Sequence, residues 1–207
     1  MFTESLEMFS RSFIFYFVVI DPLGTAAIFL TLLQRIKDNK YKIAVEASFL
    51  AFLVLVFFLI MGKSILNHLN INLYSFKIAG GIILLLISIE MLLDKRSARK
   101  EKSVQSKTIT TSVFPLAIPL LAGPAAITSV IVSSSDTYGN FLYTITHIVS
   151  LFVVLFITCL LFLLITKSEK FISKKLLQVL SRIIAIILAA LSIQFILDGL
   201  NEAYISF

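Results

Sequence analysis

The chain has 207 residues, of which 58% are hydrophobic and 14% are charged, and its formal net charge is +6. Soluble domains have about 45–50% apolar and about 25% charged residues, so this composition excludes a disordered chain, a disulfide-stapled secreted fold and a free cytosolic enzyme. A mean hydropathy of +0.99 indicates a polytopic membrane protein. The single cysteine, Cys159, excludes a disulfide framework and a C-x-x-C redox pair within one chain, and we expect it to pack as a small apolar residue.

Six apolar stretches are long enough to cross a bilayer, whose hydrocarbon core of about 30 Å requires about 20 helical residues. They cover residues 6–33, 43–61, 73–93, 112–133, 141–166 and 179–197. The first stretch is the longest, so it needs a tilt or a break to fit the membrane. The sequence therefore predicts an all-α protein with six transmembrane helices in a single membrane domain, residues 1–207.

Lysine and arginine fall mostly in three of the loops. Only three of the 18 basic residues, Arg11, Lys63 and Lys77, belong to the other side of the predicted membrane. The positive-inside rule therefore predicts that both termini lie outside and that the basic loops are cytoplasmic. These loops are residues 34–42, 94–111 and 167–178. Because the basic residues lie in short segments between apolar stretches, we expect membrane lipid as a partner and no nucleic acid.

The two halves of the sequence resemble each other. Residues 24–28 match residues 123–127 at four of five positions, and residues 82–94 resemble residues 186–198 in the same order along the chain. Similarity at two places with nearly the same spacing predicts a duplicated three-helix unit.

The predicted units are residues 1–94 and 112–207, joined by a cytoplasmic linker of residues 95–111. Because each unit has an odd number of helices, the second must enter the membrane from the opposite side. Inverted repeats of this kind are typical of secondary transporters, whose sites lie where helices of both repeats are interrupted.

The first and fourth predicted helices are each interrupted at a proline. Asp21, Pro22 and Gly24 stand deep in the first helix, where aspartate is a preferred N-cap and proline is favoured at the first helical position. Gly123 and Pro124 have the same form in the fourth helix. Each interruption predicts a half-helix that begins inside the membrane and presents its positive dipole end there. Two such helix starts predict a small anion-binding site beside a cavity.

Side chains near these breaks are candidate ligands. Asp21 is either a helix cap alone or also a group that couples transport to a proton or cation, because an intramembrane carboxylate is costly. Thr25, Thr128 and Ser129 are candidate hydroxyl ligands, although helical threonine and serine also bond their own backbone.

Three further titratable residues are candidates for coupling or gating. Glu90 lies near the cytoplasmic end of the third helix, where it is either a gate or an interfacial partner of nearby basic residues. His147 and Asp198 are expected on the outer side, where they form either a proton-relay pair or separate packing and hydrogen-bonding groups.

Enzyme signatures are absent from the sequence. There is no H-E-x-x-H motif and no P-loop, and Asp21 has no second aspartate at membrane depth with which to form a protease dyad. We therefore expect no enzymatic activity, no metal site and no cofactor.

Two proline motifs carry a family resemblance. Asp-Pro-x-Gly-x-x-x-x-Phe at residues 21–29 and Pro-Leu-x-x-Pro-x-x-x-Gly-Pro-x-Ala-Ile at residues 115–127 resemble signatures of the MarC family of bacterial inner-membrane proteins. Residues 76–84 and 193–199 also resemble that family, so the likeness covers the whole chain.

The chain departs from the family pattern at both breaks. Ala27 stands near a position where many relatives have proline, and Ala125 near one where they have glycine. The resemblance implies six helices in the bacterial plasma membrane, with the proline motifs at a central site. It also implies a link to neutral amino acid transport, because some members look like neutral amino acid transporters.

Taken together, these features predict a secondary transporter or exporter of a small polar solute, working by alternating access around the paired breaks. The half-helix starts would hold the carboxylate of the solute, and Asp21 would bind its amino group or a coupling proton or sodium ion. The alternatives are a non-transporting membrane scaffold or accessory protein, and a passive channel. The sequence predicts no particular oligomeric state.

Overall fold

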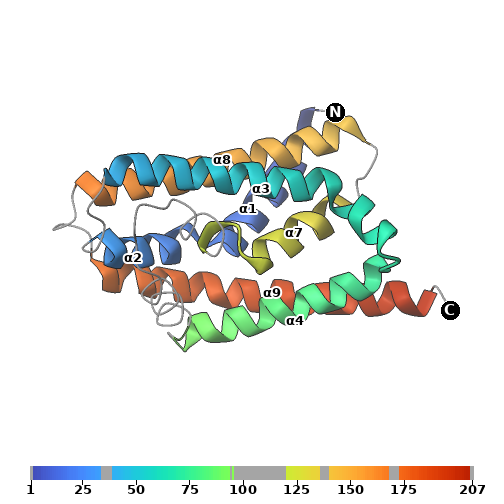
Figure 1. The fold of residues 1–207 in the computed structure, drawn as a ribbon. Coiled ribbons are helices and arrows are strands. Elements are labelled where there is room, and N and C mark those ends of the chain that lie inside the picture. The colour runs from blue at the N-terminus through green and yellow to red at the C-terminus, as the bar shows by residue number, and fades with distance from the viewer. Residues whose placement is uncertain are drawn as a thin grey trace.

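The computed structural model describes residues 2–33, 39–93, 95, 120–135, 140–167 and 173–205. Its elements are helices: α1 (Phe2–Ile20), α2 (Pro22–Leu33), α3 (Lys40–His68), α4 (Leu73–Leu92), α7 (Pro124–Ser135), α8 (Phe141–Lys167) and α9 (Lys174–Ile205). Figure 1 shows α3 and α8 along one side of an elongated bundle, α4 and α9 along the other, and α1, α2 and α7 between them.

Five stretches of the described chain are long and apolar enough to cross a membrane, one fewer than expected. They are Leu6–Thr31, which contains the boundary of α1 and α2, and the four long helices α3, α4, α8 and α9. Helix α7 has 12 residues and is about 18 Å long, which is too short for a core of about 30 Å. The predicted fourth span began at residue 112, and its part before Leu120 lies outside the described residues.

Helices α3 and α9 extend well beyond the apolar stretches from which they were predicted. Helix α3 begins at Lys40, where the Asn39 side chain caps it by accepting the Lys42 N–H at 3.3 Å, and α9 continues to Ile205. The predicted bounds were too narrow because hydropathy marks only the segment that fits into lipid, whereas charged and polar residues with good helix propensity prolong both helices.

The Leu6–Thr31 span forms the centre of the bundle. In its most apolar window 72% of the residues are buried, against 22–39% in the other four spans. Large apolar side chains of those four, such as Phe49, Leu86, Phe152 and Ile186, are exposed on the outer faces. An apolar exterior around a buried central helix is the arrangement expected of a multi-pass membrane protein.

Each short central helix packs against the long helices of the opposite half of the chain. Helix α2 contacts α8 and α9, where Phe29 stacks on Phe162 with ring centroids 4.2 Å apart. Helix α7 contacts α3 and α4, and a side chain at Gly62 of α3 would overlap Ile131 of α7. The two halves are therefore interlocked and share one core.

Helices α4 and α9 lie antiparallel and in close contact along their length (Figure 1). A Cβ atom placed on Gly81 would lie 2.7 Å from the carbonyl oxygen of Ser192, and one on Gly199 would lie 2.8 Å from that of Tyr74. Glycine at these two points allows the backbones to touch, as small residues do between membrane helices.

An ion pair joins the same two helices near the C-terminal end of α9. Lys77 Nζ lies 2.6 Å from Glu202 Oε1, and the side chains are 5% and 42% exposed. Replacing the carboxylate leaves a buried ammonium facing a neutral amide. We expect Glu202→Gln to lower the free energy of unfolding by about 1–3 kcal/mol, less than for a fully buried pair because Glu202 is partly exposed.

Denaturation in detergent micelles measures this effect, and Glu7→Gln provides the matched control. Glu7 pairs with Arg11 at 2.6 Å, but those side chains are 64% and 79% exposed, so the control should change the stability little. If both variants lost the same free energy of unfolding, the Lys77–Glu202 pair would stabilise the fold no more than the exposed pair does, and the prediction would be wrong.

Helix ends that carry lysine gather at one end of the described bundle. Helix α3 begins at Lys40, α8 ends at Lys167 and α9 begins at Lys174, whereas the two marked chain ends lie at the opposite end (Figure 1). The structure thus separates the two ends of the bundle by charge in the way the sequence predicts.

Candidate functional site

The first helix is interrupted at Asp21, inside the Leu6–Thr31 span. The Asp21 N–H donates to Phe17 O at 3.0 Å and closes α1, while its carbonyl accepts the Thr25 N–H at 2.9 Å and opens α2. The turn between the two helices is made by this one residue in the left-handed conformation, with φ of 53°. Aspartate is among the few L-residues that tolerate that conformation.

The Asp21 carboxylate caps α2 and also contacts α9. Its Oδ1 accepts the Gly24 N–H at 3.0 Å, which is the N-cap bond that the sequence predicts. Its Oδ2 accepts a hydrogen bond from Ser181 Oγ at 2.7 Å. Asp21 is only 2% exposed and Ser181 7%, so both lie within the bundle.

Ser181 was not anticipated from the sequence. It stands 160 residues from Asp21, in a helix whose sequence has no break or recognisable motif at that point. The one available signal was a small polar residue on an otherwise apolar helix, which is too common to single out a site.

Gly24 leaves room for this contact. A Cβ atom there would overlap Asp21 Oδ2 and would lie 2.6 Å from Ser181 Oγ. Pro22 is buried at the first position of α2, as predicted. The Thr25 hydroxyl donates within its own helix, at 2.9 Å to Asp21 O and 3.0 Å to Pro22 O, which is its local structural role.

The second predicted break lies at the start of α7. The helix begins at Pro124, and the Ile127 N–H donates to Gly123 O at 3.0 Å, so Gly123 is the cap residue without a side chain. Gly123 is half-buried and Pro124 exposed. The two proline-led helix starts are therefore where the sequence predicts them.

Two polar side chains near the start of α7, Thr128 and Ser129, are buried. Thr128 is buried, and its methyl group fills the space that a side chain at Gly80 of α4 would take. Ser129 is 0% exposed, and its hydroxyl makes no hydrogen bond within the part of the chain that the structure describes. The start of α7 therefore packs beside α4, whereas the Asp21 carboxylate contacts α9.

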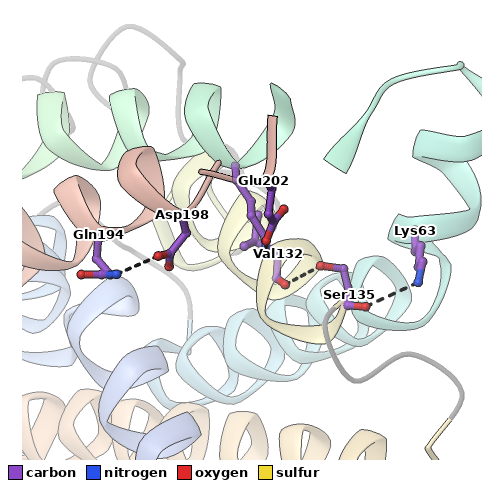
Figure 2. Close-up of polar contacts among 7 residues, drawn as sticks. Lys63, Val132, Ser135, Gln194, Asp198 and Glu202 are labelled. Atoms are coloured by element: carbon purple, nitrogen blue, oxygen red, sulfur yellow. Dashed lines mark hydrogen bonds and ion pairs between the residues drawn. The ribbon is translucent and has the colours of Figure 1, made fainter. Parts of the chain in front are cut away.

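His147 bonds a tyrosine, which fits the second of the two sequence alternatives, a packing and hydrogen-bonding group separate from Asp198. Tyr16 Oη and His147 Nδ1 are 3.0 Å apart between α1 and α8, and the two residues are 1% and 4% exposed. Asp198 is exposed and accepts from Gln194 Nε2 at 2.7 Å, as Figure 2 shows. The two residues stand on different helices, and each has a hydrogen-bonding partner that the sequence did not reveal.

Glu90 lies at the basic end of the bundle, and Lys63 of α3 lies beside the last turn of α7. Glu90 is half-buried in the last turn of α4, near the basic segments, as its assignment to that end predicts. Lys63 of α3 donates to the carbonyl of Ser135 at 3.5 Å, at the negative end of the α7 dipole (Figure 2).

The Tyr16–His147 bond ties α1 to α8 in the core. We expect Tyr16→Phe to lower the free energy of unfolding by about 1–2 kcal/mol, because it leaves a buried imidazole nitrogen without its hydroxyl. Detergent denaturation with Tyr143→Phe, at an exposed position of α8, as the control measures this. Loss of stability in the control but not in Tyr16→Phe would refute the assignment.

The family model described as "MarC family integral membrane protein" matches residues 6–204. A UPF0056 membrane protein of Archaeoglobus fulgidus is 35% identical over 205 residues, covering 97% of this chain and 96% of the relative. UPF0056 membrane proteins of Buchnera aphidicola and Aquifex aeolicus are 31% and 30% identical, covering 96% and 94% of this chain and 94% and 93% of theirs. No solved structure matches the chain.

Proposed function

The chain belongs to the MarC family of integral membrane proteins, and from this premise we propose that it is a secondary transporter or exporter of a small polar solute, with neutral amino acids as the favoured class. The observation that carries the proposal is Asp21, a carboxylate only 2% exposed at a helix start inside an apolar span. Ionisable residues in such places are costly and typically lie on the pathway of a substrate or coupling ion.

The two helix starts differ in a way that suits a zwitterion. At α2 the chain's own carboxylate already accepts the Gly24 N–H, so that end favours an ammonium group or a coupling proton or sodium ion. At α7 the cap is Gly123, which has no side chain, so the backbone N–H groups favour the carboxylate of a solute. The buried Ser129 hydroxyl in the next turn gives a polar solute a further bonding group.

We also propose that residues 1–94 and 112–207 are inverted repeats that rock against each other. Support comes from α2 packing on the long helices of the second half and α7 on those of the first. At matching positions, Ser88 Oγ donates to Leu85 O at 2.7 Å, and Ser192 Oγ donates to Ala189 O at 2.6 Å. Both serines are 0% exposed. Alternating access in such folds is a movement of one repeat against the other around a fixed site.

The proposed orientation places the basic end in the cytoplasm and both termini outside a plasma membrane. The lysines at the starts of α3 and α9 and at the end of α8 support it through the positive-inside rule. Labelling of single cysteines in intact cells tests it, in a chain whose Cys159 has been replaced by alanine. A cysteine at Lys175 that reacts with an impermeant reagent added outside would reverse the orientation.

Counterflow in proteoliposomes tests the transport proposal. The proteoliposomes are loaded with unlabelled solute, and the entry of the labelled solute is measured for a panel of neutral amino acids and other small metabolites. Asp21→Asn is compared with the wild type, and Glu7→Gln is the exposed-carboxylate control. We expect saturable exchange of one solute class that Asp21→Asn weakens or uncouples and the control leaves intact. Folded, inserted protein without exchange would favour a scaffold or accessory role, and flux without saturation would favour a channel.

A further inference from the structure

An apolar groove runs between α3 and α8 on the outer surface of the bundle. It encloses about 370 Å³ and is lined on α3 by Val45, Phe49 and Phe52 and on α8 by Phe156, Cys159 and Leu163. Phe49 and Phe156 are 62% and 53% exposed, so the groove opens outward. In a membrane protein, this is a place for a hydrocarbon chain.

The hydroxyl in the groove does not favour a polar occupant. Ser48 also lines it, but its Oγ donates to Ala44 O of its own helix at 2.9 Å. The wall therefore offers dispersion contacts and aromatic faces. Phe52 and Phe152 meet edge to face across the groove with ring centroids 5.7 Å apart, which fixes the spacing of the two helices there.

Lysines continue both walls of the groove at the basic end of the bundle. Lys42 precedes Val45 by one helical turn, and Lys167 follows Leu163 by one turn, so both stand on the faces that line the groove. Both lysines are exposed. Tyr41, 49% exposed at the same level, is a residue type enriched where membrane meets water.

Positive charge predominates at this end. The charged groups described near it on the two helices are Lys40, Lys42, Glu46 and Lys167, an excess of two positive charges. Glu46 Oε1 lies 3.6 Å from Lys42 Nζ and offsets part of that charge. The backbone N–H groups at the start of α3 add a positive dipole end.

We propose that this groove is a binding site for an anionic phospholipid. One acyl chain lies between α3 and α8, and the phosphate lies against Lys42 and Lys167. Basic pockets between membrane helices bind anionic headgroups in this way. A second copy of the chain fits less well, because a symmetric contact would bring the same lysines of both subunits together.

Tryptophan fluorescence tests the site directly, because the chain has no tryptophan of its own. Phe156→Trp places the probe in the groove, and Phe57→Trp places one at an exposed position of α3 outside it. Each variant is reconstituted into vesicles of unlabelled phosphatidylcholine. Increasing fractions of brominated phosphatidylglycerol or brominated phosphatidylcholine are then included, because brominated acyl chains quench tryptophan.

We expect brominated phosphatidylglycerol to quench the Phe156→Trp variant at a lower mole fraction than brominated phosphatidylcholine, with no such difference for Phe57→Trp. Adding Lys42→Gln or Lys167→Gln should weaken the preference about fivefold for each lysine removed. Adding Lys175→Gln, at an exposed position near the start of α9, should leave it unchanged.

Two results would overturn the proposal. Equal quenching by both brominated lipids would mean that the groove takes bulk lipid without headgroup selection. Protection of the Phe156→Trp probe from both lipids, together with a cross-linked dimer, would mean that a second copy fills it. Circular dichroism and gel filtration of every variant confirm that the fold is retained in each comparison.

Discussion

Replacing Gly24 by alanine is expected to break the contact between the two halves of the chain at Asp21. The added methyl group would overlap Asp21 Oδ2 and would lie 2.6 Å from Ser181 Oγ. The carboxylate cannot move away easily, because its other oxygen holds the Gly24 N–H and its backbone is fixed in a left-handed turn. We expect the free energy of unfolding to fall by about 1–3 kcal/mol, and the proposed exchange activity to be lost.

Ser181→Ala separates the two parts of this effect. It removes the hydrogen bond to Asp21 without adding volume, so it should cost about 1 kcal/mol of stability and reduce exchange less than Gly24→Ala. Detergent denaturation gives the stability and counterflow gives the activity. Wild-type stability in Gly24→Ala would mean that the carboxylate can rotate away from the added methyl group. That result would contradict the claim that Gly24 is needed for close packing at α2.

Gly81→Val is expected to have the largest effect on stability, because it forces α4 away from α9. The Cβ atom would lie 2.7 Å from the Ser192 carbonyl oxygen, a backbone atom that can shift only with its helix. The displacement would also strain the neighbouring Lys77–Glu202 pair. Overpacking typically costs about 1–3 kcal/mol and occasionally more, and we expect the upper part of that range or beyond it.

Ala79→Val provides the matched control. Ala79 lies two residues away on the same helix and is exposed, so the two methyl groups that valine adds there extend to where lipid can give way. It should leave the unfolding transition almost unchanged. Helix propensity favours Gly81→Val over Ala79→Val, because valine is a better helix former than glycine and a poorer one than alanine. Equal losses in the two variants would therefore contradict the contact with Ser192 as the cause.

The helix starts were predictable because their causes are local. Asp21 and Pro22, and Gly123 and Pro124, are residue types that favour the N-cap and the first helical position whatever surrounds them, and α2 and α7 begin as these pairs predict. The outer limits of α3 and α9 were less predictable, because high hydropathy marks only the residues that lie in lipid, whereas a helix can continue beyond them.

The partners of the site residues were not predictable, because they depend on which helix faces which. Ser181 meets Asp21 across 160 residues of sequence, and Tyr16 meets His147 across 131. The sequence left two alternatives for His147 and Asp198 for the same reason: a shared membrane side does not make two residues neighbours, since each helix presents most of its surface to other helices or to lipid.

By itself, the sequence determined the membrane class, the charge difference between the two ends, the family and the two proline-led helix starts. Composition, loop charge and capping preference act residue by residue, so no packing is needed to deduce them. Only the tertiary structure decided that α2 and α7 pack on the opposite halves, that Ser181 contacts Asp21, and that α3 and α8 enclose a groove below Lys42 and Lys167. Those features arise from side-chain shape and close approach at glycine, which hydropathy does not encode.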